Sequence, residues 1–219
     1  MISLNLSADE VRIVGCLMEK SVTTPDQYPL TLNALTNACN QKTARNPVMA
    51  LTQGAVQHAT RGLSDKRLVR TEENFSRGIE KYSHRFCNTG YSELQFDDAQ
   101  YAIVCVLLLR GSQTPGELRA HSGRLHEFAD NAAVVEALSE LMTRDDAPLV
   151  IQLPRTPGRK DAEYMHLFSG SIDVDAYVEA IQTNKSSEPS SRVNITDLAQ
   201  RLSDLEAAVA DLKQQLGVS

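Results

Sequence analysis

The fold is decided by residues 29–86, and the centre of this stretch, residues 52–70, reads TQGAVQHATRGLSDKRLVR. Apolar side chains recur at helical spacing at Val56, Ala59 and Leu63, so a helix with one buried face is predicted over residues 52–65. The opposite face of this helix carries polar side chains and no aliphatic ones. This helix is the element around which we interpret the rest of the chain.

Helical and extended patterns flank the central helix. A helix is predicted from Leu30 to about Asn40, a strand at residues 68–70 and a return strand at residues 81–86. The long connection between the two helices is expected to include a short edge strand at Val48 to Ala50. Helix, helix and hairpin in this order are typical of a winged helix-turn-helix, whose second helix can enter a DNA major groove.

The outer face of the central helix and the segments beside it supply the candidate DNA-binding residues. Residues 41–86 contain nine basic and four acidic side chains, an excess that could meet phosphates. Gln57 could pair with an adenine edge and Arg61 with a guanine, one helical turn apart. The alternative is that these are ordinary solvated side chains of a small domain. The full set of candidates is Lys42, Arg45, Gln53, Gln57, Thr60, Arg61, Ser64, Lys66, Arg67 and Arg77.

The sequence pattern repeats. The first helix is opened by a capping box at Ser7 to Glu10, and its apolar residues reappear 90 positions later, as does the pair Thr24-Pro25, at Thr114-Pro115. The return-strand residues Tyr82, His84 and Phe86 reappear 82 positions later as Tyr164, His166 and Phe168. We therefore predict two copies of one fold, at residues 1–95 and 96–170.

The second copy differs from the first in charge. Its helices are predicted from Asp97 to Arg110, from Thr114 to His121 and onward from Asp130. Residues 96–170 contain seven basic and eleven acidic side chains, which would repel a phosphate backbone. This copy is better suited to packing against the first copy or against a protein partner.

The C-terminal region predicts self-association. Residues 171–192 read as a short helix and a flexible linker, and residues 193–219 as a coiled-coil helix. The alternative is an amphipathic helix docked on its own chain, although that arrangement needs a wider apolar stripe. The spacing between apolar residues alternates between three and four positions along the expected dimerisation seam. This seam consists of Ile195, Leu198, Leu202, Leu205, Val209, Leu212 and Leu216.

Composition and motifs argue against an enzyme. The chain of 219 residues has 22 Lys and Arg against 28 Asp and Glu, so any nucleic-acid contact must be local. Its four cysteines form no C-x-x-C pair and read as buried reduced thiols, and no cofactor or metal is expected. His84 and His166 read as packing residues rather than ligands. Residues 1–5 show no secretory pattern, and we expect a cytoplasmic protein without membrane association.

Three motifs carry a family resemblance: YPLTLNAL at residues 28–35, ACNQKT at 38–43 and RNPV at 45–48. With the return strand at Tyr82 to Phe86, they make the chain similar to the YceH-like family of uncharacterised bacterial proteins over roughly residues 5–170. The resemblance implies tandem winged-helix domains and a bacterial cytosolic protein. It implies no reaction, ligand or DNA site.

Together these patterns predict a mostly helical α+β protein with two tandem winged helix-turn-helix domains and a C-terminal coiled-coil helix. We expect a dimeric DNA-binding or regulator-like protein, with double-stranded DNA and a second copy of the chain as partners. The alternative is a non-enzymatic adaptor that binds proteins through its winged-helix and coiled-coil surfaces.

Overall fold

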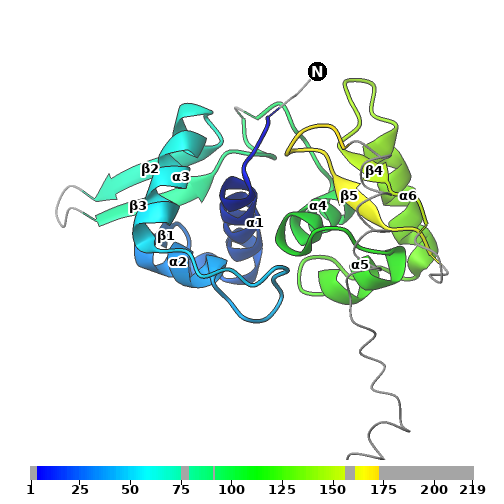
Figure 1. The fold of residues 1–219 in the computed structure, drawn as a ribbon, viewed down its shortest axis with the longest axis horizontal. Coiled ribbons are helices and arrows are strands. Elements are labelled where there is room, and N and C mark those ends of the chain that lie inside the picture. Colours follow the sequence, from blue (N-terminus) through cyan, green and yellow to red (C-terminus); the bar gives the residue numbers. More distant parts are fainter. Residues whose placement is uncertain (1–3, 75–78, 91, 156–160, 173–219) are drawn as a thin grey trace, which may run out of the picture. The chain divides into compact units, whose positions relative to one another are not determined.

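The computed structural model describes residues 4–74, 79–90, 92–155 and 161–172. Within these residues, six α-helices and two small antiparallel sheets form a mixed, mostly helical α+β fold (Figure 1), so the predicted fold class is confirmed at this level. The described residues belong to one compact unit, residues 1–174. The predicted coiled coil and nearly all of the predicted linker lie outside the described residues.

The elements follow the same order in both halves of the described chain. The first half contains α1 (Ala8–Thr23), the 3-10 turn η1 (Pro25–Gln27), β1 (Leu30–Thr31), α2 (Leu32–Cys39), α3 (Gln53–Asp65), β2 (Val69–Asn74) and β3 (Ile79–His84). The second half contains α4 (Asp98–Arg110), α5 (Pro115–Ser122), α6 (Asn131–Met142), β4 (Val150–Gln152) and β5 (Tyr164–His166).

Side-chain caps set where the helices begin. Ser7 opens α1 with the predicted capping box, and Thr114 opens α5 with a second one, because Glu10 and Glu117 return a hydrogen bond to the cap backbone. Thr52 caps α3 by accepting a hydrogen bond from the Ala55 backbone N–H at 3.2 Å. The cap residues therefore encode the helix starts locally.

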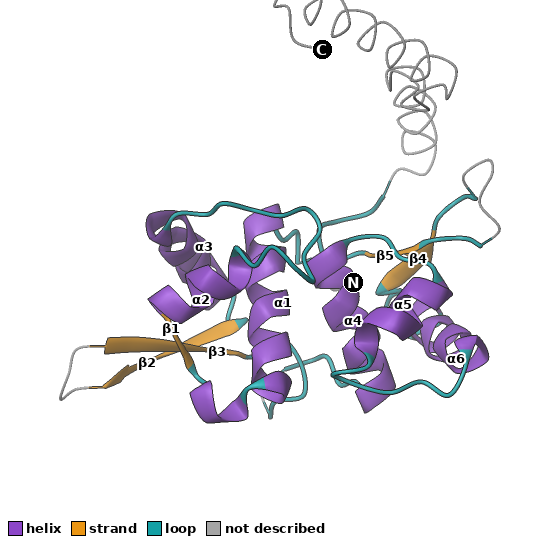
Figure 2. Ribbon diagram, turned by 90° about the horizontal axis from the view of Figure 1, so that it is seen from below, coloured by secondary structure: helices purple, strands orange, loops and turns teal. Residues whose placement is uncertain are grey.

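The first sheet has the strand order β1-β3-β2, with Leu30 opposite Tyr82. The second sheet pairs β4 with β5, and a single bridge from Gln113 to Tyr164 takes the place that β1 has in the first sheet. Figure 2 shows the two sheets on opposite sides of the central helices α1 and α4.

The edge strand predicted at Val48 to Ala50 is wrong, because β1 provides the third strand and Val48 is 56% exposed. Other partners hold the backbone around this segment. Arg12 Nη2 donates to the Pro47 carbonyl at 2.7 Å, and the Asn46 N–H donates to the Leu109 carbonyl at 3.0 Å. These contacts bind the connection to α1 and α4 instead of to the sheet.

The caps also define which positions of the two halves are equivalent. Ser7 and Asp97 cap the first helix of each half and lie 90 residues apart, as the repeat predicts. The second-helix caps are Thr31 and Thr114, 83 residues apart. Thr114 therefore does not correspond to Thr24, which ends α1. The predicted match failed because the first half inserts η1 between its first and second helices.

The two halves meet through α1 and α4, which lie side by side at the centre of Figure 1. A Cβ atom added at Gly15 would lie 2.9 Å from Leu109 Cδ2, so only glycine allows this close crossing. The Cys105 thiol donates to the Gly15 carbonyl at 3.6 Å, and these two residues occupy the same position in their helices. Phe86 and Phe168, which occupy equivalent positions in the two return strands, pack edge to face with their ring centroids 4.9 Å apart. Equivalent positions therefore face one another, as around an approximate two-fold axis.

A single apolar core runs through both halves. It includes Leu17 and Leu63 of the first half and Leu107 and Leu138 of the second, all with no solvent exposure. The four cysteines are buried and free, which agrees with the prediction of reduced thiols.

Candidate nucleic-acid interface

The α3 helix presents the largest group of predicted site residues. Gln53 and Arg61 are exposed and Gln57 is half-buried on its outer side. His58 is exposed on the same helix, although its sequence signal, a polar residue beside Gln57, was not used in the prediction. We refer to Gln53, Gln57, His58 and Arg61 as the α3 outer face.

Thr60 is not part of this face, and its prediction as a DNA-binding residue is wrong. Its side chain is 1% exposed, and its hydroxyl donates to the Val56 carbonyl at 2.6 Å. Val56, Thr60 and Leu63 are spaced by four and three residues and form the buried stripe of α3. Threonine fits this stripe because its methyl group packs while the carbonyl one turn earlier satisfies its hydroxyl.

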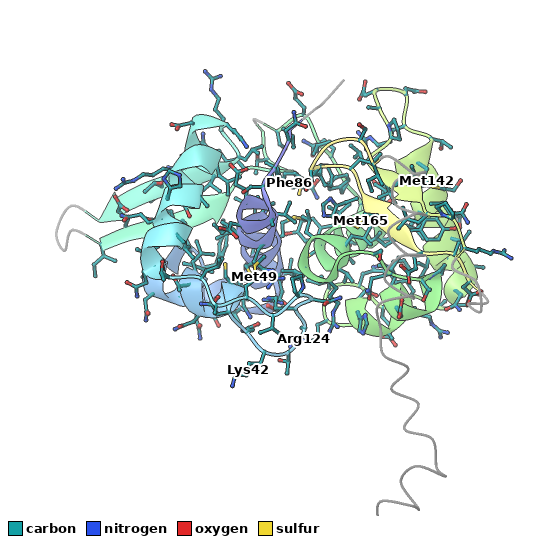
Figure 3. All side chains as sticks on the ribbon, in the orientation of Figure 1. Lys42, Met49, Phe86, Arg124, Met142 and Met165 are labelled. Atoms are coloured by element: carbon teal, nitrogen blue, oxygen red, sulfur yellow. The ribbon has the colours of Figure 1, made fainter. Side chains whose placement is uncertain are left out.

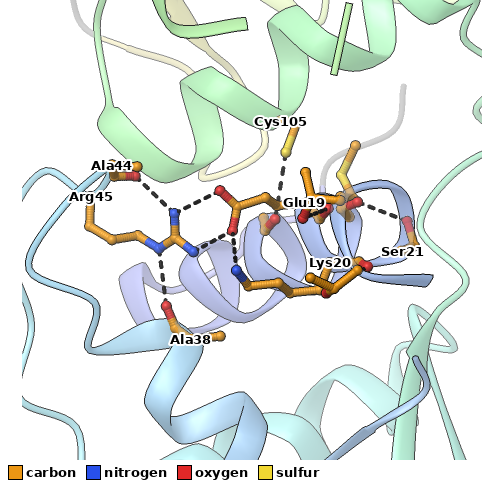
Figure 4. Close-up of polar contacts among 11 residues, drawn as sticks. Glu19, Lys20, Ser21, Ala38, Ala44, Arg45 and Cys105 are labelled. Atoms are coloured by element: carbon orange, nitrogen blue, oxygen red, sulfur yellow. Dashed lines mark hydrogen bonds and ion pairs between the residues drawn. The ribbon is translucent and has the colours of Figure 1, made fainter. Parts of the chain in front are cut away.

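Arg45 is also inside the protein rather than on the surface. Its guanidinium binds both carboxylate oxygens of Glu19, at 2.6 and 3.2 Å, and donates to the carbonyls of Ala38 and Ala44 (Figure 4). Burial alone would raise the pKa of Glu19, but the hydrogen bonds and positive charge of Arg45 outweigh it, so this pKa lies below its ordinary value. Arg45 therefore stabilises the connection before α3 and is not available to phosphates.

Two further candidate DNA-binding residues at the end of α3 are less accessible than predicted: Lys66 is in an ion pair, and Ser64 is partly buried. Lys66 forms an ion pair with Glu10 at 2.8 Å while its side chain stays 36% exposed. Ser64 is half-buried, and its hydroxyl has no hydrogen-bond partner among the described residues. Gly62 lets Glu10 approach, since an added Cβ would lie 3.2 Å from the carboxylate. These contacts make Lys66 a weaker phosphate ligand than a free lysine.

The remaining cations lie on segments that precede or follow α3 in the chain. Lys42 in the connection, Arg67 in the turn after α3 and Arg70 on β2 are exposed. Arg70 lies 3.3 Å from Glu72, in an ion pair with both partners solvent-exposed. Such pairs are weak, so Arg70 can exchange its partner for a phosphate. Arg77, the predicted wing contact, lies outside the described residues.

Arg61 lies close to the hairpin, because its charge acts on the pKa of Tyr82 in β3. Burial, followed by the hydrogen bond to Glu80 at 2.5 Å, raises the pKa of Tyr82, and the charge of Arg61 opposes that rise. At the other end of α3, Gln53 donates to the Asn33 side chain of α2 at 3.2 Å. The α3 outer face thus continues onto α2 and onto the hairpin, and Asn33 is a surface residue that the helix pattern alone did not single out.

The equivalent face of the second half has different chemistry. Thr52 and Asp130 cap α3 and α6 and lie 78 residues apart, so Val135 occupies the place of Gln57 and Glu136 that of His58. Arg61 is replaced by Ser139. Val135 is 44% exposed, and both Glu136 and Glu140 are exposed on the same helix. Of these two equivalent helices, α3 therefore presents the polar and cationic face.

The predicted packing histidines are enclosed by aromatic rings. His84 lies between Tyr28 and Tyr101, with ring centroids 6.4 and 6.3 Å away, and His166 stacks on Phe168 at 5.8 Å. Burial lowers the pKa of both histidines to about 4, so both are neutral at pH 7.

The metal-ligating side chains of the described residues are scattered. Over those ranges, three or more His, Cys, Asp or Glu side chains nowhere gather closely enough to hold a metal ion. None of the helices in the described part is both long and apolar enough to cross a membrane.

Comparison with known proteins relates nearly the whole chain to one family. The model of a family described as "Protein of unknown function, DUF480" matches residues 6–159. A UPF0502 protein of Shewanella oneidensis is 50% identical over 217 residues, covering 97% of this chain and 96% of the relative. A UPF0502 protein of Serratia proteamaculans is 49% identical over 211 residues, with coverage of 96% and 94%. A UPF0502 protein of Vibrio atlanticus is 46% identical over 211 residues, with coverage of 96% and 93%.

Proposed function

The chain belongs to the DUF480 family, and from its surface we propose that it binds double-stranded DNA through α3 of a winged helix-turn-helix. The resemblance to the YceH-like family is confirmed at the level of family. We propose a cytoplasmic, non-enzymatic protein that acts as a dimer and resembles a transcriptional regulator.

The observation that carries this proposal is the contrast between the α3 outer face and its counterpart on α6. Gln57 and Arg61 are one helical turn apart on α3, while Val135 and Ser139 hold the same places on α6. Glutamine and arginine can each form two hydrogen bonds with one base edge, whereas valine cannot read a base by hydrogen bonding. A helix selected only for packing would not need this difference.

The surroundings of α3 support the same interpretation. Two helices followed by a hairpin, with the strand order β1-β3-β2, form the arrangement that winged-helix domains use to bring a helix to the major groove. Lys42 and Arg67 are exposed on the segments before and after α3 in the chain, and phosphate contacts from these two residues would set the position of the helix.

A dimer would complete the recognition surface. The second half of each chain is acidic, so of the equivalent helices α3 and α6 it is α3 that offers a cationic face. The predicted coiled coil, from Ile195 to Leu216, would bring two such faces together, as in regulators that read two half-sites. This segment lies outside the described residues, and its role is part of the proposal.

The proposal is tested by the salt dependence of DNA binding. We expect the full-length protein to bind a random-sequence duplex at low salt in a fluorescence anisotropy titration. The double variant Arg61→Ala, Arg67→Ala should weaken binding and reduce the slope of log K against log salt by about 0.9 for each phosphate that is no longer neutralised. The same titration with Arg144→Ala, Arg155→Ala, which removes equal charge from the second half, should leave both quantities close to those of the natural protein. No binding at low salt, or an unchanged slope for the first variant, would remove the basis of the proposal.

One observation favours a second function, that of a non-enzymatic protein-binding adaptor. Val135 is 44% exposed on α6 beside the exposed Glu136 and Glu140, a surface that suits a protein better than DNA. The two functions are distinguished by Val135→Lys. This change should leave DNA affinity intact or increase it, whereas an adaptor that uses α6 would lose its protein partner.

A further inference from the structure

A cavity of about 390 Å³ lies where the two halves of the fold meet. Its walls come from the C-terminal turns of α1 and α4, from the connection before α3 and from α5 with the residues after it. This volume falls in the range of small-molecule sites in proteins. The lining residues are Glu19, Thr23, Thr43, Ala44, Val106, Leu109, Arg110, Ala120, His121, Gly123, Arg124 and Leu125.

Two cations that line this cavity have no protein partner within the described part of the chain. Arg110 is half-buried at the end of α4, and Arg124 lines the cavity after α5; neither forms a hydrogen bond or an ion pair with the residues that the structure describes. Burial, and secondly the nearby charge of Arg45, lower the pKa of Arg110, and the charge of Glu19 compensates only part of this shift. Figure 3 labels Arg124, and also Lys42 of the connection before α3.

Glu19 is the one acidic residue in the described lining, and its charge is already neutralised. Arg45 binds its carboxylate at 2.6 Å, and Lys20 lies 3.3 Å from the same oxygen (Figure 4). The cavity therefore carries a net positive charge from Arg110 and Arg124.

His121 uses its Nδ1 atom in a hydrogen bond with Gln113, and its Nε2 atom can contact a ligand. Gln113 Nε2 donates to the Ser112 carbonyl at 2.7 Å, which directs Gln113 Oε1 to accept a hydrogen bond from His121 Nδ1 at 2.8 Å. Burial, and then the charge of Arg110, lower the pKa of His121, while Glu117 opposes that shift. A bound anion would raise this pKa and allow Nε2 to carry a proton toward the ligand.

We propose that this cavity binds a small organic anion, a carboxylate or phosphate ester attached to an apolar body. Arg110 and Arg124 bind the charged group, and His121 adds a hydrogen bond. The apolar body packs against Val106 and Leu109 of α4 and Leu125 beyond α5. The inference stands on the cavity itself and does not require that the protein bind DNA.

The test uses three related probes with the full-length protein: 1-naphthyl phosphate, 1-naphthoate and the neutral 1-naphthalenemethanol. Isothermal titration calorimetry should give saturable binding of both anions and binding of the alcohol at least about tenfold weaker, since the alcohol lacks the charge. Arg110→Gln should weaken the anions by about tenfold or more while leaving the alcohol unchanged. Arg155→Gln, which changes an exposed arginine outside the cavity lining, is the matched control and should bind as the natural protein does.

A second variant keeps the test decisive if Arg110→Gln fails to fold. Ala120 is exposed at the edge of the cavity, so Ala120→Phe should fill the site without disturbing the core, and it should abolish binding of both anions. The proposal is overturned if neither anion binds, if the alcohol binds as well as the anions, or if binding survives in Ala120→Phe.

Discussion

Acid should destabilise this protein through His166 well before its carboxylates are protonated. The side chain is 4% exposed, it stacks on Phe168, and its Nδ1 has no hydrogen-bond partner among the described residues. Burial lowers its pKa from 6.5 to about 4. Between these two pH values His166 is protonated in the unfolded chain and neutral in the folded chain. The free energy of unfolding therefore decreases as the pH falls from about 6.5 to about 4.

The size of this loss follows from the two pKa values. At pH 5 the difference in protonation corresponds to roughly 2 kcal/mol for His166. His84 has the same shift and the same sign, so it adds to the effect. Glu10 and Glu19 contribute little at this pH, because their pKa values lie below their ordinary range and their stabilisation is lost only in stronger acid.

The assay is urea denaturation at pH 8 and at pH 5, followed by circular dichroism. His166→Phe keeps an aromatic ring against Phe168 and removes the titrating group, so it should lose roughly 2 kcal/mol less than the natural protein between the two pH values. His58→Phe, which makes the same substitution at an exposed histidine, is the matched control. If His166→Phe and the natural protein lose equal stability, the burial argument is refuted.

Three further perturbations test the packing and the assembly. Gly15→Ala should destabilise the protein by about 1–3 kcal/mol, because the added Cβ would overlap a leucine of α4. Gly54→Ala should stabilise the protein by up to about 1 kcal/mol, because its added Cβ would lie 3.9 Å from Thr52 Oγ1. Both changes are measured by thermal denaturation. Arg45→Met alone should cost roughly 3 kcal/mol because it removes the guanidinium that binds both Glu19 carboxylate oxygens and leaves this carboxylate to Lys20. Arg45→Met with Glu19→Met should recover most of that loss in urea denaturation. Truncation after Ser187 should convert a dimer into a monomer in light scattering, and an unchanged mass would contradict the coiled-coil prediction.

The helix starts could be predicted because their causes lie within four residues. Ser7 and Glu10 close one capping box, and Thr114 and Glu117 close another, without help from distant parts of the chain. Helical periodicity likewise identified the buried side of α3. The order of elements, and with it the mostly helical α+β class, followed from these local signals.

The failures concern residues whose environment is set by distant parts of the chain or by their own backbone. Arg45 reads as a surface cation because its partner, Glu19, lies 26 positions earlier. Thr60 reads as polar and therefore exposed, although a carbonyl of its own helix satisfies its hydroxyl. Val48 pairs with no strand because α1 and α4 hold the neighbouring backbone, a contact that no local pattern encodes. The cavity was missed because its walls come from both halves.

The contact between the two halves has an evolutionary consequence. In a dimer of identical chains, every substitution on the symmetry axis faces its own copy, so a large side chain there meets another large one. Here Gly15 faces Cys105, and the leucines of α4 fill the space that the glycine leaves. Joining the halves in one polypeptide allows each to mutate without changing the other. One half can therefore keep a cationic helix face while its twin acquires acidic and apolar residues, a division of labour that no dimer of identical subunits can reach.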